Sequence, residues 1–185
     1  MMLDELREEV CRANLRLVAE GLVFMTWGNV SGIDRAGGRV VIKPSGVPYE
    51  GMAPEHMVVV SLEDGRVVDG GLGPSSDTPT HLELYRALSS IGGIVHTHSP
   101  EATAWAQAGM DIPLYGTTHA DHFNGPVPVT RVLREEEVEH DYEANTGIVI
   151  IEQFHTLHPL EMPAVLVAHH GPFTWGTDAM DAVVN

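Results

Sequence analysis

The sequence predicts an α/β protein in which a central, mostly antiparallel sheet is covered by helices. Three features indicate this class: helical spacing of apolar residues at the start, short β-rich runs separated by glycine turns after it, and helices alternating with apolar strands in the remainder. Of the 185 residues, 43% are hydrophobic and 19% are charged, which is the composition of a globular chain. We expect residues 1–185 to form one domain with a sizeable core.

The first predicted elements are an amphipathic helix and a set of antiparallel strands. Apolar residues recur at helical spacing over residues 3–17, and Gly21 is typical of a helix end. Two pairs of turn residues, Gly37-Gly38 and Asp64-Gly65, separate the β-rich runs that follow and predict hairpins. The predicted strands lie within residues 22–34, 38–46 and 57–68.

The second half of the chain alternates helices and strands. Pro79 and Pro100 stand in the first turns of two predicted helices, and Gly109 ends the second of them. Thr177 or Asp178 is suited to cap a last helix. We expect helices at residues 78–90, 100–109, 134–154 and 177–185, strand and loop at 112–130, and buried strands at 92–99 and 163–176, the latter ending in a turn.

The charge of the chain excludes several classes of partner. Lys and Arg number 10 against 26 for Asp and Glu, so the net charge of −16 repels nucleic acids and anionic membranes. No apolar run approaches the ~20 residues that span a bilayer, and acidic residues stand where a signal peptide would be basic, so we expect a cytoplasmic protein. Cys11 is the one cysteine, which excludes an internal disulfide.

Histidines at two apolar strand ends suggest a metal site. In "GGIVHTHSPEA", His96 and His98 share a face if the strand is extended through both, with Cα atoms roughly 6.6 Å apart. An isolated His-x-His is also common on half-buried strands, so further ligands are required. The stretch "AVLVAHHGPFTW" delivers His169 and His170 to the end of another strand, and one of the two can supply a third nitrogen.

A helix start and two loops are suited to a phosphate. In "GPSSDTPTH", Ser76 or Asp77 is a plausible N-cap, but free N–H groups beside the hydroxyls of Ser75 and Ser76 also form an anion site. There Asp77 could ligate a metal while the serines hold the phosphate. The small residues of "TWGNVSG" and "KPSG" allow close approach to the backbone. These loops add donors from Asn29, Lys43 and Ser45.

Seven motifs follow one another along nearly all of the 185 residues: "TWGNVSGID", "VIKPSG", "MVVVSLEDGRVV", "PSSDTPTHLELY", "GGIVHTHSPEATAWAQAG", "GTTHADHF" and "HHGPFTWG". Together they resemble the class II aldolase and epimerase family. The resemblance implies a three-layer α/β sandwich. It also implies a divalent metal, typically zinc, with Mn²⁺ or Co²⁺ as substitutes, held by His96, His98 and His170.

The resemblance also implies roles for residues around this metal. Aldolases of the family have a glutamate at the position of Asp77, whereas the epimerases have an aspartate, so Asp77 indicates an epimerase and a further metal ligand. Asp121 is implied to be an acid/base residue. The implied phosphate contacts are Asn29, Ser45, Gly46, Ser75 and Ser76, to which Lys43 is added from its position in "KPSG".

The implied reaction is the zinc-dependent epimerisation of L-ribulose 5-phosphate to D-xylulose 5-phosphate at C4 by a retro-aldol and an aldol step, as in arabinose use. The family forms homotetramers with active sites at subunit interfaces, so the implied partners are a phosphorylated pentulose and three further copies. Family members continue past the position of Asn185 with a segment that carries a catalytic tyrosine, so we expect this domain to lack that segment.

Other functions are compatible with parts of this pattern. An aldolase acting on a related sugar phosphate, and a shortened relative that binds metal with weak catalysis, both remain open. A cupin-like metalloprotein also carries His-x-His before a glutamate, here Glu101, but the helical segments do not suit an all-β barrel. We interpret Trp27, Trp105 and Trp175 as packing residues, and residues 134–143 as a solvated helix face.

Overall fold

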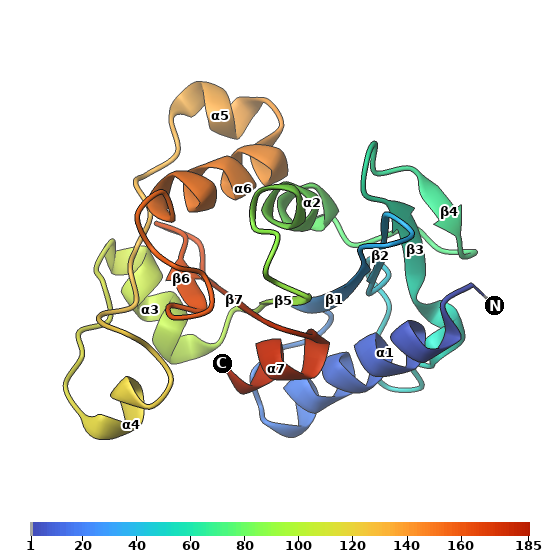
Figure 1. Cartoon of the computed structure of the whole chain (residues 1–185), viewed down its shortest axis with the longest axis horizontal. Helices are drawn as coiled ribbons and strands as arrows, with labels where there is room; N and C mark the ends of the chain where they lie inside the picture. Colours follow the sequence, from blue (N-terminus) through green and yellow to red (C-terminus); the bar gives the residue numbers. More distant parts are fainter. Residues whose placement is uncertain (1) are drawn as a thin grey trace.

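Seven strands form one sheet in which every neighbouring pair is antiparallel, as the computed structural model of residues 2–185 shows (Figure 1). The strand order is β4-β3-β2-β1-β5-β7-β6. The strands are β1 (Asn29–Asp34), β2 (Arg39–Ile42), β3 (Val58–Ser61), β4 (Val67–Asp69), β5 (Gly93–His96), β6 (Ala164–Leu166) and β7 (Pro172–Gly176). The predicted α/β class with an antiparallel sheet is confirmed.

Helices cover both faces of this sheet. In Figure 1, α1 and α7 lie together on one side of the strands and α2 and α6 on the other. The helices are α1 (Asp4–Ala19), α2 (Thr78–Ala87), α3 (Pro100–Ala108), α4 (Thr117–Ala120), α5 (Glu135–Glu139), α6 (Tyr142–Gln153) and α7 (Ala179–Val184), with a 3₁₀ turn, η1 (Pro54–His56). The predicted three layers are therefore present.

The alternation of strand side chains divides the core into two halves. Val40 of β2 packs in the cluster beneath α2 and α6, whereas Val41 packs in the cluster beneath α1 and α7. Close packing of α7 depends on Gly93, because a Cβ atom there would lie 2.3 Å from the carbonyl oxygen of Asp178. Asp178 caps α7, since its side chain accepts a hydrogen bond from the N–H of Asp181 at 2.8 Å.

Two predicted segments differ from the structure for reasons of backbone conformation. The run 22–34 was expected to be extended, but β1 begins only at Asn29, and residues 22–28 form a loop in which Met25 has a φ of 54°. The helix expected over 134–154 is two helices, α5 and α6. They meet at Asp141, whose φ of 54° is left-handed and incompatible with a continuous helix.

Two further segments contain more structure than expected. The strand expected over 163–176 is a hairpin of β6 and β7, and His169 in its turn has a φ of 65°. The segment 112–130, expected to be strand and loop, contains the short helix α4 between single bridges such as Ile112 to Val127. The hairpin carries His170, one of the predicted metal ligands.

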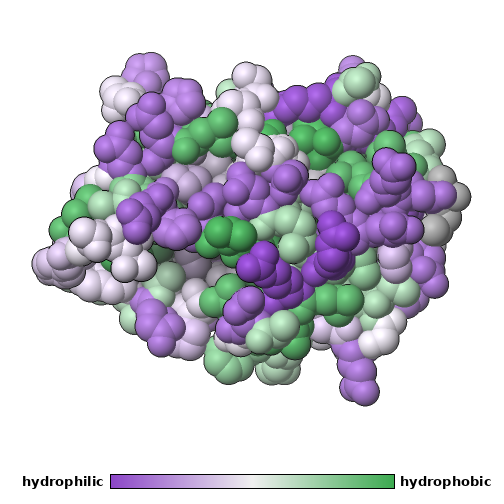
Figure 2. Space-filling model, turned by 60° about the horizontal axis from the view of Figure 1, so that its bottom comes forward, coloured by the Kyte–Doolittle hydropathy of each residue, from purple (hydrophilic) through white to green (hydrophobic). Residues whose placement is uncertain are grey.

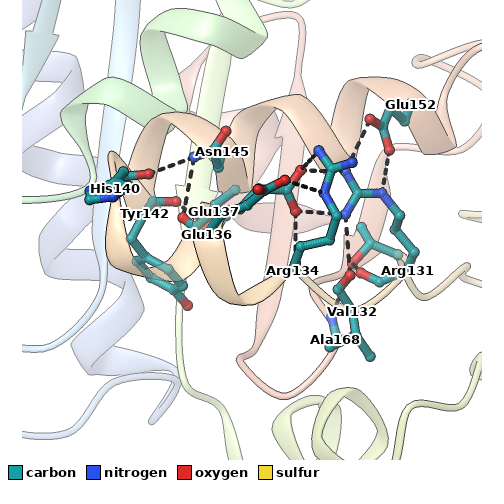
Figure 3. A network of polar contacts seen from close by, with 12 residues as sticks. Arg131, Val132, Arg134, Glu136, Glu137, His140, Tyr142, Asn145, Glu152 and Ala168 are labelled. Atoms are coloured by element: carbon teal, nitrogen blue, oxygen red, sulfur yellow. Dashed lines mark hydrogen bonds and ion pairs between the residues drawn. The ribbon is translucent and has the colours of Figure 1, made fainter.

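The surface mixes polar and apolar residues. On the face that comes forward in Figure 2, hydrophilic residues surround smaller hydrophobic groups. Within residues 2–185, no helix combines the length and the apolar character that crossing a bilayer requires. Glu137 departs from the solvated helix face expected at 134–143, because its side chain is buried and paired with Arg131 and Arg134 (Figure 3).

Candidate metal centre and phosphate pocket

Three imidazole rings converge at one edge of the sheet. His96 is the last residue of β5, His98 lies in the loop after it, and His170 lies in the turn between β6 and β7. The Nε2 atom of His98 is 3.1 Å from the Nε2 atoms of both His96 and His170. Potential ligand atoms of the three residues all lie within 4.8 Å of one another. The His-x-His spacing and the second histidine motif therefore meet at one point.

Burial keeps two of these rings neutral. Desolvation lowers the pKa of His96 well below its ordinary value, and it also lowers the pKa of His170. The Nδ1 atom of His96 lies 2.9 Å from the carbonyl oxygen of Pro172, which assigns the proton to Nδ1. The Nε2 lone pair of His96 is then free and directed to the centre.

The donor set fits a divalent metal such as zinc. Three neutral imidazole nitrogens with one open position form a common catalytic zinc site. Tetrahedral Zn–N bonds of about 2.0–2.1 Å place ligand nitrogens about 3.3 Å apart, close to the 3.1 Å separations of the Nε2 atoms. His169 does not join the set, because its left-handed backbone in the turn leaves its side chain exposed.

Asp77 occupies the N-cap position of α2, but its carboxylate does not cap the helix. Instead, its Oδ2 atom accepts a hydrogen bond of 2.6 Å from the side-chain amide of Asn29. The Ser75 carbonyl accepts hydrogen bonds from the N–H and the hydroxyl of Thr78, at 3.1 and 2.6 Å. The interpretation of Asp77 as merely a capping residue is therefore wrong, since its charge is directed into the site.

The histidines form one wall of a pocket of about 310 Å³. Of the eleven residues predicted for the site, ten line this pocket: Asn29, Lys43, Ser45, Gly46, Ser75, Ser76, Asp77, His96, His98 and His170. Asp121 is the exception, because it lies on the surface at the end of α4. Strand register explains part of this convergence, since Asn29 of β1 is paired with His96 of β5.

A second wall of the pocket, formed by Ser45, Gly46, Ser75 and Ser76, is suited to an anion. Two loops meet there, because the N–H of Ser45 donates to the Gly73 carbonyl at 2.9 Å and the N–H of Ser75 donates to the Lys43 carbonyl at 3.0 Å. Lys43 also lines the pocket, and its ammonium donates to three backbone carbonyls at 3.1–3.3 Å. Burial lowers the pKa of Lys43 to about 8. Lys43 thus adds positive charge rather than a free donor.

Trp27, interpreted from the sequence as a packing residue, lies at the pocket. Its side chain is 53% exposed and its ring centroid is 6.0 Å from that of His98. The loop at residues 22–28 holds it there in place of the expected strand. Trp175 is buried as expected.

Sequence reasoning missed two polar residues near the site, His81 and Tyr142. His81 has no sequence signal as a site residue, yet its Nδ1 atom lies 2.7 Å from the hydroxyl of Ser31, which lies 2.8 Å from that of Tyr85. All three side chains are buried, and desolvation lowers the pKa of His81 to about 3. The other residue is Tyr142, whose hydroxyl contacts His170. Strong helical periodicity could have placed His81 on the buried face of α2, but no local pattern points to Tyr142.

Comparisons with known proteins agree with this geometry. Residues 8–185 match the family described as the Class II Aldolase and Adducin N-terminal domain. The chain is 60% identical over 183 residues to the L-ribulose-5-phosphate 4-epimerase UlaF of Salmonella paratyphi C, and 59% identical to that of Salmonella paratyphi B. In both cases the alignment covers 99% of this chain and 80% of the relative.

Solved structures of aldolases have the same fold. An L-fuculose 1-phosphate aldolase is 26% identical, with a TM-score of 0.82 over 100% of this chain and 81% of the aldolase. The L-fuculose-1-phosphate aldolase of Thermus thermophilus has a TM-score of 0.73 at 22% identity, over 97% of this chain and 87% of that chain. The open sheet between helices excludes the cupin alternative. By family match and by identity, the chain belongs to the class II aldolase and adducin N-terminal domain family.

Proposed function

We propose that this chain is a divalent-metal-dependent epimerase that interconverts L-ribulose 5-phosphate and D-xylulose 5-phosphate. The observation that carries the proposal is one pocket of about 310 Å³ that is lined by converging imidazole nitrogens and by the loops at Ser45-Gly46 and Ser75-Ser76. A 60% identical relative that bears the name of this epimerase supports the choice of substrate. The proposal includes zinc as the metal, a cytoplasmic location and a role in arabinose use.

The stereochemistry of the substrate determines what the site must do. C4 is not adjacent to the C2 ketone, so its hydrogen is not acidic and proton abstraction cannot invert this carbon. The C3–C4 bond must break instead: the C4 hydroxyl loses its proton and becomes an aldehyde, and the bonding electrons pass to the ketone fragment. When bound, the metal would supply Lewis-acid chemistry to the ketone end of the sugar.

The phosphate wall retains the aldehyde fragment during this step. The loops at Ser45-Gly46 and Ser75-Ser76 would hold the phosphate of glycolaldehyde phosphate, while the fragment turns its carbonyl over. Re-addition of the ketone fragment to the other face then forms the C3–C4 bond with inverted configuration at C4. The buried charge of Lys43, which lines the same pocket, favours the dianion.

Proton transfer requires one group on each face of C4. Asp77 lines the pocket and is bonded to Asn29, so its carboxylate is held in place as a metal ligand or proton acceptor. Asp121 lies outside the pocket of its own chain. We propose that a homotetramer brings Asp121 of one subunit to the pocket of a neighbour, which would make the active site an interface site.

Conversion of L-ribulose 5-phosphate by zinc-loaded protein tests the proposal, with bound metal measured on the same sample. Formation of D-xylulose 5-phosphate that stops on chelation and returns with zinc supports the epimerase. Absence of conversion by a protein that holds one zinc per chain would refute it.

An aldolase on a related sugar phosphate is the second candidate, favoured by the similarity to L-fuculose 1-phosphate aldolase. The two functions differ in their products. An aldolase releases an aldehyde and dihydroxyacetone or its phosphate, whereas an epimerase retains both fragments until they recombine. Release of free glycolaldehyde phosphate at the rate of substrate loss would therefore identify an aldolase.

A further inference from the structure

His170 differs from His96 in how its ring is held. His96 belongs to a strand and its Nδ1–H donates to the carbonyl of Pro172. His170 lies in the β6–β7 turn, where its backbone N–H donates to the Val167 carbonyl at 3.0 Å. The ring centroids of His96 and His98 lie 4.7 and 5.1 Å from that of His170. These neighbours leave Nδ1 of His170 to be held by another contact, as the second nitrogen of a ligating histidine usually is.

That contact is the hydroxyl of Tyr142, the first residue of α6. The Tyr142 oxygen lies 3.1 Å from Nδ1 of His170, and the two ring centroids are 5.9 Å apart. Nε2 of the same ring faces His98 in the centre. When Nε2 binds a metal through its lone pair, the ring proton resides on Nδ1 and donates to the phenol oxygen.

Several contacts fix the position of Tyr142 on α6. The Thr146 hydroxyl donates to the Tyr142 carbonyl at 2.9 Å, and the Thr80 hydroxyl of α2 donates to the Glu143 carbonyl at 2.6 Å. Gly147 allows the two helices to approach, since a Cβ atom there would lie 2.7 Å from Cβ of Glu83. The helix that carries Tyr142 is thereby joined to the helix that begins beside Asp77.

A second set of contacts holds the preceding helix against α6. Glu137 of α5 accepts hydrogen bonds from Arg131 and Arg134 at 2.6–2.9 Å, and Arg131 also pairs with Glu152 at the far end of α6. In Figure 3 the Tyr142 ring points away from this arginine–glutamate cluster. The cluster therefore supports the helix backbone and leaves the phenol free to contact His170.

We propose that Tyr142 is a positioning residue that sets the tautomer and orientation of His170 as a metal ligand. The inference rests on the proposed metal function of the three histidines. Tyr142 does not line the substrate pocket, so its effect is on metal binding and not on contact with the sugar. The α5–α6 unit is, on this view, part of the metal site.

The test is a comparison of Tyr142→Phe with Tyr115→Phe, which removes a hydroxyl from a tyrosine that is 85% exposed. Each protein is loaded with Zn²⁺, and the rate of zinc release to a chelator is measured. The same proteins are loaded with Co²⁺ to record their visible absorption spectra, and the melting temperatures of the metal-free forms are measured. We expect Tyr142→Phe to release zinc about 10- to 100-fold faster than the unmodified protein, with an altered Co²⁺ spectrum and an unchanged melting temperature of the metal-free form.

The possible results separate the explanations. Zinc release and a Co²⁺ spectrum equal to those of the unmodified protein would overturn the proposal. A lower melting temperature of the metal-free variant with an unchanged spectrum would assign Tyr142 to packing instead. Unmodified protein that binds zinc but has no epimerase activity would refute the proposed function and leave this inference standing, whereas failure to bind zinc would refute both.

Discussion

The Asp77→Asn variant tests whether the carboxylate of Asp77 has a chemical role or whether this residue only begins a helix. The side chain makes no capping hydrogen bond, and Asn keeps its shape and an oxygen that can accept from Asn29. The stability cost is then the loss of a negative charge at a helix start, about 0.3–1 kcal/mol. For a domain of this length, that corresponds to a fall in melting temperature of at most about 4 °C.

Activity should respond much more strongly than stability. A carboxylate that accepts the C4 hydroxyl proton contributes about 10²- to 10⁴-fold to the rate, so kcat of Asp77→Asn should fall by that factor. The matched control is Asp178→Asn, the same change at the N-cap of α7, where Asn caps as well as Asp.

Both variants are assayed for conversion of L-ribulose 5-phosphate and for thermal unfolding. We expect similar small decreases in melting temperature, with activity lost only in Asp77→Asn. If Asp77→Asn retains kcat within a factor of two or so, its carboxylate has no chemical role. The reasoning from the unused cap would then be wrong.

Three further changes test other parts of the structure. His98→Ala removes the nitrogen between His96 and His170, so bound zinc measured by elemental analysis after dialysis should fall from one per chain to a trace. The pKa of Lys43 is lowered to about 8, so its charge is lost as pH rises through 8; KM for the sugar phosphate should increase there, and Lys43→Met should have a high KM at all pH values. Gly93→Ala forces a Cβ atom against the Asp178 carbonyl, and chemical denaturation should show a loss of about 1–3 kcal/mol.

Elements with a buried face and clear end signals were predictable from the sequence. α1, α2 and α3 have helical spacing between proline or glycine boundaries, and the β1–β2 and β3–β4 hairpins have glycine turns. Residues 22–28 were misinterpreted because their apolar side chains have high β propensity but several are exposed, as for Phe24 and Trp27. The break between α5 and α6 has no Gly or Pro, since Asp141 itself adopts the left-handed conformation.

The site was predictable where its residues are close in sequence. Two short patterns predicted residues that line the pocket. One is the spacing of His96 and His98, and the other is the stretch "PSSDTPTH". Strand alternation could not choose between His169 and His170, because the pair lies in a turn and not on a strand. Tyr142 could not be found at all, since it precedes His170 by 28 residues and only the packing of α6 on α2 brings them together.

The net charge of the chain and the donors of the pocket act on an anionic ligand at different distances. A net charge of −16 repels a sugar phosphate at long range, so attraction must arise within the pocket. Lys43 is the one lysine or arginine among the described residues that line it, and its ammonium is already bonded to carbonyls. In the proposed function, recognition of the dianion would therefore depend on backbone N–H groups and hydroxyls at short range, together with the charge of a metal held by the three histidines. Such a pocket would favour a small ligand that can enter it over a polyanion that the net negative charge of the chain repels.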